Sequence, residues 1–183
     1  MLSRDTGLRC LERSRLLSEE QERQLVENQT LLLVAVCALN HWTIKEIGEV
    51  YDMTRAQCIK HVLTLERMNI AQLLPGERMR LCVARDFDWL PGGPIRQFVL
   101  TQGLGDFLAS RFAGEDESLE FLQGMLTGPA VAQLKIELRR LRSRVAPLHA
   151  ETVDVPLSQK RGTGLLIALR EWEPQVFTVR RRK

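Results

Sequence analysis

The stretch TIKEIGEVYDMTRAQCIKHVLTLERMNIAQLLPGERMRLCV, residues 43–83, decides the fold that we predict for this chain. Thr43 and Glu46 have the spacing of a capping box, which predicts the start of a first helix. Thr54 is placed to cap a second helix over residues 55–68, in which apolar residues recur at helical spacing. The stretch is therefore expected to begin as helix, tight turn and helix.

Two short apolar runs follow Asn69, a residue type that accepts the left-handed conformation at the end of a helix. They cover residues 70–74 and 79–83 and flank Pro75-Gly76-Glu77-Arg78, which is typical of the turn of a β-hairpin. Helix, turn, helix and hairpin in this order form an architecture that binds duplex DNA.

This stretch resembles bacterial winged-helix transcription regulators of the broad MarR and Lrp kind. The run ARDFDWLPGGPIRQF, residues 84–98, is similar to a subgroup that often carries a phage-repressor-type helix-turn-helix ahead of this region. The resemblance covers residues 19–102, with Asn69 where members usually carry glycine. It implies a winged helix-turn-helix and a cytoplasmic, nucleoid-associated regulator that binds double-stranded DNA.

Composition sets outer limits on the function. The chain has 183 residues, 44% hydrophobic and 27% charged, which is typical of a globular protein. Its net charge of +3 is compatible with nucleic acid but too small to demonstrate binding. Four scattered cysteines without a C-x-x-C pair favour free thiols in a reducing compartment. The longest apolar run, residues 31–39, is far shorter than the roughly 20 residues that span a bilayer, so we expect a soluble protein without a membrane partner.

We expect a mainly α protein with a small β component, organised in two regions. Residues 1–112 would hold an N-terminal helix from a capping box at Ser18 to about Leu39, the winged helix-turn-helix and a linker helix that begins at Pro94. Residues 113–183 would form a small α+β region, in the order strand, helix, strand and helix, for dimerisation or effector binding.

Three details of the first region follow from local sequence. Residues 31–39 are apolar on every side, so the C-terminal region or a second subunit should cover that helix. Residues 86–93 read as an irregular loop. The run Gly103-Leu104-Gly105 should break the linker helix.

The second region should contain strands near residues 119–126 and 165–171. The helix that begins at Pro129 should end near Ala146, because Pro147 follows. Pro174 should open a short final helix. Because two strands and one helix make an unstable sheet, we expect a homodimer to complete it. The long helix has an apolar seam that suits either an antiparallel helix pair between subunits or packing on the small sheet: Val131, Leu134, Leu138, Leu141 and Val145.

Candidate DNA contacts lie on the polar half of the second helix and on the hairpin. Gln57 is suited to read an adenine edge, and Lys60 a guanine or a phosphate. Arginines at the hairpin tip are suited to a flanking backbone or minor groove. The full predicted set is Thr54, Arg55, Gln57, Lys60, His61, Thr64, Arg67, Arg78 and Arg80.

Two other hypotheses stay open. One is a winged helix kept as a protein-interaction scaffold, because basic and acidic residues balance over residues 41–70 and phosphate contacts usually supply much of the affinity. The four-spaced pair Ile59 and Leu63 also widens the apolar arc of the second helix. The other hypothesis places DNA binding mainly in a separate domain upstream of Met1.

Enzyme and metal signatures are missing from the sequence. It has no glycine-rich phosphate loop after a strand and no G-x-S-x-G motif. Cys58 and His61 are three residues apart, but a metal site usually needs three or four ligands. We therefore expect no enzyme, catalytic residue, metal or cofactor. The expected partners are duplex DNA, a second copy and an unidentified small-molecule effector.

Overall fold

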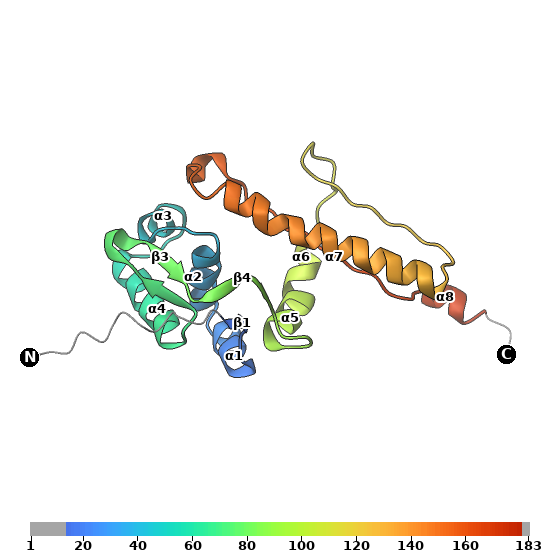
Figure 1. Cartoon of the computed structure of the whole chain (residues 1–183), viewed down its shortest axis with the longest axis horizontal. Coiled ribbons are helices and arrows are strands. Elements are labelled where there is room, and N and C mark those ends of the chain that lie inside the picture. Colours follow the sequence, from blue (N-terminus) through green and yellow to red (C-terminus); the bar gives the residue numbers. More distant parts are fainter. Residues whose placement is uncertain (1–13, 181–183) are drawn as a thin grey trace, which may run out of the picture.

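The computed structural model describes residues 14–180 and is mainly α-helical with little β-structure, as predicted (Figure 1). We call residues 14–107 the body and residues 108–180 the arm. The body contains β1 (Ser14–Leu16), α1 (Glu19–Glu27), α2 (Gln29–Leu39), α3 (Ile44–Val50), α4 (Arg55–Arg67), β2 (Ala71–Leu73), the 3-10 turn η1 (Pro75–Glu77), β3 (Met79–Leu81), β4 (Val83–Asp88), α5 (Pro94–Phe98), the π-helical η2 (Val99–Gly103) and α6 (Leu104–Phe107). The arm contains α7 (Gly128–Glu151), the 3-10 turn η3 (Leu157–Gln159) and α8 (Gln175–Thr178).

Capping boxes begin α1, α3 and α4, which confirms the three predicted helix starts. In each box the hydroxyl of the cap residue accepts from an amide one turn on, and the side chain there accepts from the cap residue's own amide. The pairs are Ser18 with Gln21, Thr43 with Glu46 and Thr54 with Gln57.

We predicted one continuous helix from Ser18 to about Leu39. This prediction is wrong, because the chain divides into two helices at Asn28. The Asn28 backbone is non-helical, with φ −124° and ψ 89°, and its side chain accepts from the Leu31 amide at 3.0 Å. The same residue therefore ends α1 and caps α2, which lets α1 fold back against α2.

The predicted hairpin is confirmed. Asn69 has φ 55°, and β2 pairs with β3 in antiparallel register, with Ala71 opposite Leu81. The predicted loop over residues 86–93 starts later than expected, because β4 continues to Asp88 and pairs in parallel with β1. That pairing joins segments about 70 residues apart, which local sequence does not reveal.

The apolar helix α2 is covered inside the body. Its Leu31, Val34 and Ala38 are fully or almost fully buried, and α1, α4 and β3 pack around it. The prediction that the C-terminal region or a second subunit must cover this helix was wrong for most of its surface. The bend at Asn28 is the reason, because it brings α1 onto a side that a continuous helix would have left open. Val36 remains 41% exposed.

Glu22 of α1 is the one charged side chain among the described residues that is completely buried. Its carboxylate accepts from the Leu90 amide at 2.7 Å and from the Ile95 amide at 3.2 Å. A buried carboxylate is tolerated only when its oxygens are hydrogen-bonded. The residue therefore fixes the turn at 89–93 and the start of α5 against α1.

The predicted start of the linker helix at Pro94 is confirmed, but the predicted break at residues 103–105 is wrong. Instead of interrupting the helix, Gly103 lies at the end of a π-helical stretch, and α6 follows without a gap. The wider π turn accommodates the glycines while keeping the backbone helical.

The arm departs most from prediction. None of its described residues from 113 to 180 belongs to a strand, so the two expected strands are extended segments without a ladder. α7 is longer than predicted, because it continues through Pro147 to Glu151. Proline removes the N–H that would bond the Ser143 carbonyl, but both residues are exposed, so water reaches that carbonyl. The short final helix after Pro174 is confirmed as α8.

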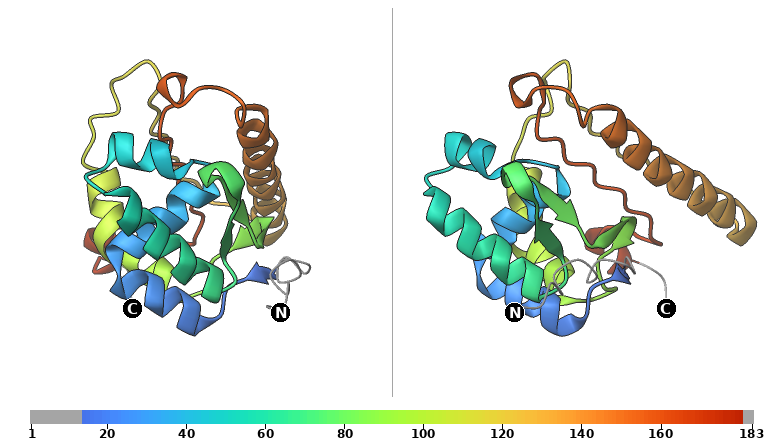
Figure 2. Two further views of the ribbon diagram at one scale, coloured as in Figure 1. Left: turned by 90° about the vertical axis from the view of Figure 1, so that its left-hand side faces the viewer. Right: turned by 60° about the vertical axis from the view of Figure 1, so that its left-hand side comes forward.

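The arm is also open to solvent. No described residue of the arm is buried, and α7 extends away from the body (Figure 2). Near its C-terminal end, His149 stacks on His41 of the body with ring centroids 5.6 Å apart. Within the described residues, no helix is both long and apolar enough to cross a membrane.

The cysteines differ from the prediction of free thiols. Cys82 is disulfide-bonded, whereas Cys37 and Cys58 are free and buried. Cys10 lies outside the described residues. Spacing along the chain does not show which cysteines a fold brings within bonding distance, so this disulfide could not be predicted from the sequence.

We predict that Glu22→Gln lowers the free energy of unfolding by about 1–3 kcal/mol, because the amide –NH2 would face a backbone N–H and leave it without an acceptor. Thermal or urea unfolding measures this. Glu27→Gln, on the exposed end of the same helix, is the matched control and should change stability by no more than about 0.5 kcal/mol. Equal effects of the two substitutions would contradict the structural role of Glu22.

Candidate nucleic-acid interface

The helix α4 has a buried stripe and an exposed arc. Cys58, Val62 and Leu65 face the core and are fully buried. The opposite arc carries Lys60 and Arg67, both exposed. Hydrogen bonds within the body fix both ends of this helix, so the arc has a defined position.

The start of α4 is fixed by its capping box. The Thr54 amide donates to Gln57 Oε1 at 2.8 Å, and the Gln57 amide donates to Thr54 Oγ1 at 3.3 Å. At the other end, Gln21 Nε2 of α1 donates to the Met68 carbonyl at 2.6 Å. The second bond satisfies one of the carbonyls that a helix leaves without a partner at its C-terminus.

The capping role of Gln57 changes the expectation for this side chain. A bidentate contact with adenine needs both the oxygen and the nitrogen of the amide. The oxygen already accepts from Thr54, so reading adenine would open the cap. The pattern T-x-x-Q indicates this capping role in the sequence, but we predicted Gln57 only as a DNA contact.

Ile59 and Leu63, which were predicted to widen the buried arc together, differ in their burial. Ile59 is half-buried and packs against the core, whereas Leu63 is 46% exposed. At 100° per residue, Leu63 lies about 140° around the helix from Cys58, on the far side from the core. Leu63 therefore lies in the exposed arc beside Lys60 and Arg67.

Arg67 folds back along this arc. Its Nη2 donates to Thr64 Oγ1 at 3.0 Å, and the Thr64 hydroxyl donates to the Lys60 carbonyl at 3.1 Å. These are bonds between exposed groups and compete with water, so each adds little to stability. A phosphate could therefore replace them at low cost.

The hairpin is attached to the start of α4 by an ion pair between Arg55 and Glu77. This contact places the hairpin tip beside the helix and offsets the charge of Arg55, which is consequently a weaker candidate for a phosphate contact. Arg78 is exposed, and Arg80 donates to Gln72, its cross-strand neighbour.

His61 is half-buried, and this changes its charge. Burial and then the neighbouring charge of Lys60 hold the pKa of His61 below its ordinary value. The imidazole is therefore neutral at neutral pH and can serve as a hydrogen-bond partner but not as a cation.

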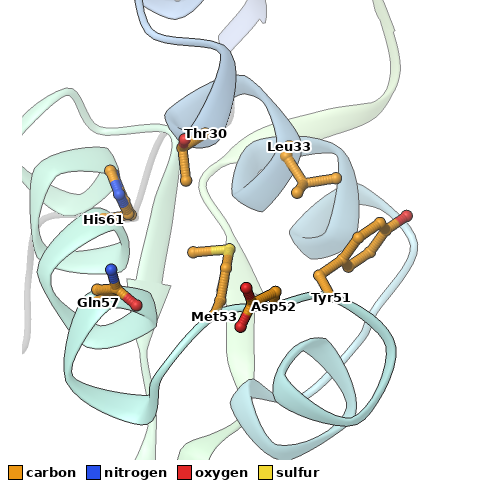
Figure 3. Close-up of a pocket in the computed structure, with 7 residues that line it drawn as sticks. All are labelled: Thr30, Leu33, Tyr51, Asp52, Met53, Gln57 and His61. Atoms are coloured by element: carbon orange, nitrogen blue, oxygen red, sulfur yellow. The ribbon is translucent and has the colours of Figure 1, made fainter.

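A hollow of about 360 Å³ lies between α2, the turn after α3 and α4 (Figure 3). Leu33 and Met53 give it apolar walls, and Asp52 contributes a carboxylate. Gln57 and His61 line it from α4. The Asp52 charge would repel a phosphate on this side, which favours an approach of nucleic acid from the side of Lys60, Arg67 and the hairpin. The remaining lining residues are Thr30 and Tyr51.

The predicted contact residues lie on α4, on its N-cap and on the hairpin, with Gln57 and His61 on the side of the hollow. All nine are exposed or half-exposed, so the protein's own packing does not hide them. Over the described part of the chain, no salt bridge involves the cations of Lys60, Arg67, Arg78 or Arg80. Four positive charges are thus available on the arc and the hairpin.

The thiols of Cys37 and Cys58, which lie in this region, are unreactive. Burial, and to a smaller extent the nearby Cys58, raise the pKa of Cys37 to about 11, and burial also raises the pKa of Cys58. Both stay protonated at neutral pH, and a protonated thiol is a poor metal ligand. Among the described residues, no group of three or more His, Cys, Asp and Glu side chains is placed to hold a metal ion.

Comparisons with protein-family models, with curated proteins and with solved structures found no match to this chain. The assignment of function therefore depends on the geometry of α4 and the hairpin.

We predict that Thr54→Ala lowers the free energy of unfolding by about 1 kcal/mol, because the first turn of α4 loses its hydroxyl acceptor. Thr54→Ser should keep most of the stability. Thr64→Ala, on the same helix but away from the cap, is the control and should not destabilise, since alanine is the better helix former. Urea unfolding of the three variants tests this, and a Thr54→Ser as unstable as Thr54→Ala would contradict it.

Proposed function

We propose that residues 43–83 are a winged helix-turn-helix that binds duplex DNA, and that the protein is a bacterial transcription regulator that acts as a homodimer. The observation that carries this proposal is the exposed arc of α4, where Lys60 and Arg67 lie opposite the buried stripe and beside a hairpin that carries Arg78 and Arg80. A helix with its apolar side buried and cations outward suits the major groove.

The division of roles follows from the geometry. Lys60 and Arg67 make phosphate or guanine contacts, because both are exposed cations on one helix face. Arg78 and Arg80 hold the flanking backbone. Thr54 and Gln57 position the helix through its cap, while His61 and Thr64 contribute neutral hydrogen bonds. Arg55 acts mainly by attaching the hairpin through Glu77.

A second candidate function is a winged-helix scaffold that binds another protein. Leu63 favours it, since an apolar side chain in the centre of the exposed arc suits a protein contact. The same side chain also suits contact with a thymine methyl group. Binding of duplex DNA distinguishes the two functions, because only the DNA-binding function requires salt-sensitive affinity.

We predict that the full chain binds duplexes with a random central segment, and that Lys60→Ala combined with Arg67→Ala weakens this binding. The slope of log affinity against log salt concentration should fall by about 2, since two phosphate contacts are lost. Fluorescence anisotropy at several salt concentrations measures the slope.

The matched control removes two other exposed cations, Arg139 and Arg140 of α7, by substitution with alanine. It should change the slope much less than the α4 variant. An equal loss in both would show a response to net charge alone, and no salt-sensitive binding by the unmodified chain would favour the scaffold.

A further inference from the structure

The helix α7 carries a regular heptad seam. Its apolar residues alternate spacings of three and four, and the continuation of the helix past Pro147 adds Leu148 to the five that the sequence indicated. In heptad notation, Val131, Leu138 and Val145 occupy the a positions, and Leu134, Leu141 and Leu148 occupy the d positions.

This seam lacks a cover within the described chain. None of its six side chains is buried, and Leu141 and Leu148 are 46% and 59% exposed. The main packing neighbour of α7 is β4, and its contact with the body includes the stack of His149 on His41 near the C-terminal end. The seam is therefore open along the length that projects from the body.

The chain exposes more surface than a compact chain of the same mass. The chain exposes 14791 Å², whereas a compact single chain of its mass exposes about 9,000 Å². Obligate homodimers bury roughly 2,000–5,000 Å² in their interfaces. The arm has further exposed apolar side chains outside α7, among them Phe121, Leu122, Met125 and Leu165. Because the area of a homodimer interface is shared between two chains, such an interface would cover roughly 1,000–2,500 Å² of each, which is less than half of the excess of about 5,800 Å².

We infer that the seam of α7 pairs with the same seam of a second copy of this chain in a parallel, two-stranded coiled coil. Within parallel coiled coils, valine at two of three a positions and leucine at every d position favours two strands. This inference does not depend on DNA binding. Of the two alternatives left by the sequence, packing on a small sheet is ruled out within the described residues, because the described arm has no sheet to receive the helix.

The charges beside the seam favour the parallel arrangement over the antiparallel one. In a parallel pair, Glu137 at position g faces Arg142 at position e of the second copy, which is attractive. In an antiparallel pair with the same hydrophobic layers, Lys135 would face Arg142, which is repulsive. Glu137 attracts an arginine in both arrangements, so the difference lies with Lys135. Its contribution is small, since such exposed pairs contribute less than about 1 kcal/mol each.

Cysteine crosslinking of the full chain tests the pairing and its direction together. In a parallel pair Leu141 lies opposite its own copy, so Leu141→Cys should form a covalent dimer after mild oxidation. Ser143→Cys, at the outward f position, is the matched control and should not exceed the unmodified chain. Non-reducing electrophoresis reads both, and light scattering of the unmodified chain should give twice its 21.0 kDa.

Each other outcome overturns the inference. An antiparallel pair would crosslink a mixture of Leu138→Cys and Leu141→Cys chains but neither variant alone. A mass of one chain would show that the seam does not pair with a second copy. A dimer in which Leu141→Cys crosslinks no better than Ser143→Cys would place the contact elsewhere. The inference rests on the homodimer of the proposed function but not on its DNA binding. None of these measurements contains DNA, so they test the pairing of the chains separately from the binding of duplex DNA.

Discussion

The buried carboxylate of Glu22 determines how the two ends of the body are joined. Burying a charge is costly unless its oxygens are hydrogen-bonded, and both donors to this carboxylate come from a segment about 70 residues away, the backbone amides of Leu90 and Ile95. Gly93 shows how closely the segments approach, because a Cβ atom there would lie 2.5 Å from Glu22 Oε2. The direction in which α5 leaves the body, and therefore the position of everything after it, depends on this contact.

The same helix also sets the position of α4. Gln21 accepts from the Ser18 amide through Oε1 and donates to the Met68 carbonyl through Nε2. One turn of α1 thus contacts the end of α4 through Gln21 and the start of α5 through Glu22. Together with the hairpin, held at the start of α4 by Arg55 and Glu77, these contacts leave α4 little freedom to rotate. An exposed arc can act as a reading surface only if its side chains keep a fixed direction.

The features predictable from sequence are those set by neighbouring residues. The caps at Ser18, Thr43 and Thr54 and the left-handed Asn69 each depend on a few consecutive residues, the hairpin depends on one continuous short segment, and all are present. The capping of α2 by Asn28 also depends on neighbouring residues. We did not predict it, because the long apolar run that follows suggested one continuous helix. The pairing of β4 with β1 and the covering of α2 depend on segments that are distant in the sequence.

The arm was the least predictable part of the chain. A segment with strand propensity forms a strand only where a neighbouring segment offers backbone hydrogen bonds to it. The residues that we predict to contact DNA could be chosen from the sequence as one face of a helix. That Gln57 caps α4 and that Arg55 pairs with Glu77 became evident only in the structure.

A parallel pairing of α7 would also constrain how two bodies meet DNA. The body contacts α7 at His149, an e position next to the seam and close to its C-terminal end. In a parallel pair both bodies would therefore lie at the same end of the coil, on opposite sides of it, related by a two-fold axis. Two α4 helices in this arrangement would face a site with matching two-fold symmetry, and the spacing of its halves would follow from the His41–His149 contact. The side chains of α4 would then select bases while the arm selects the distance between half-sites.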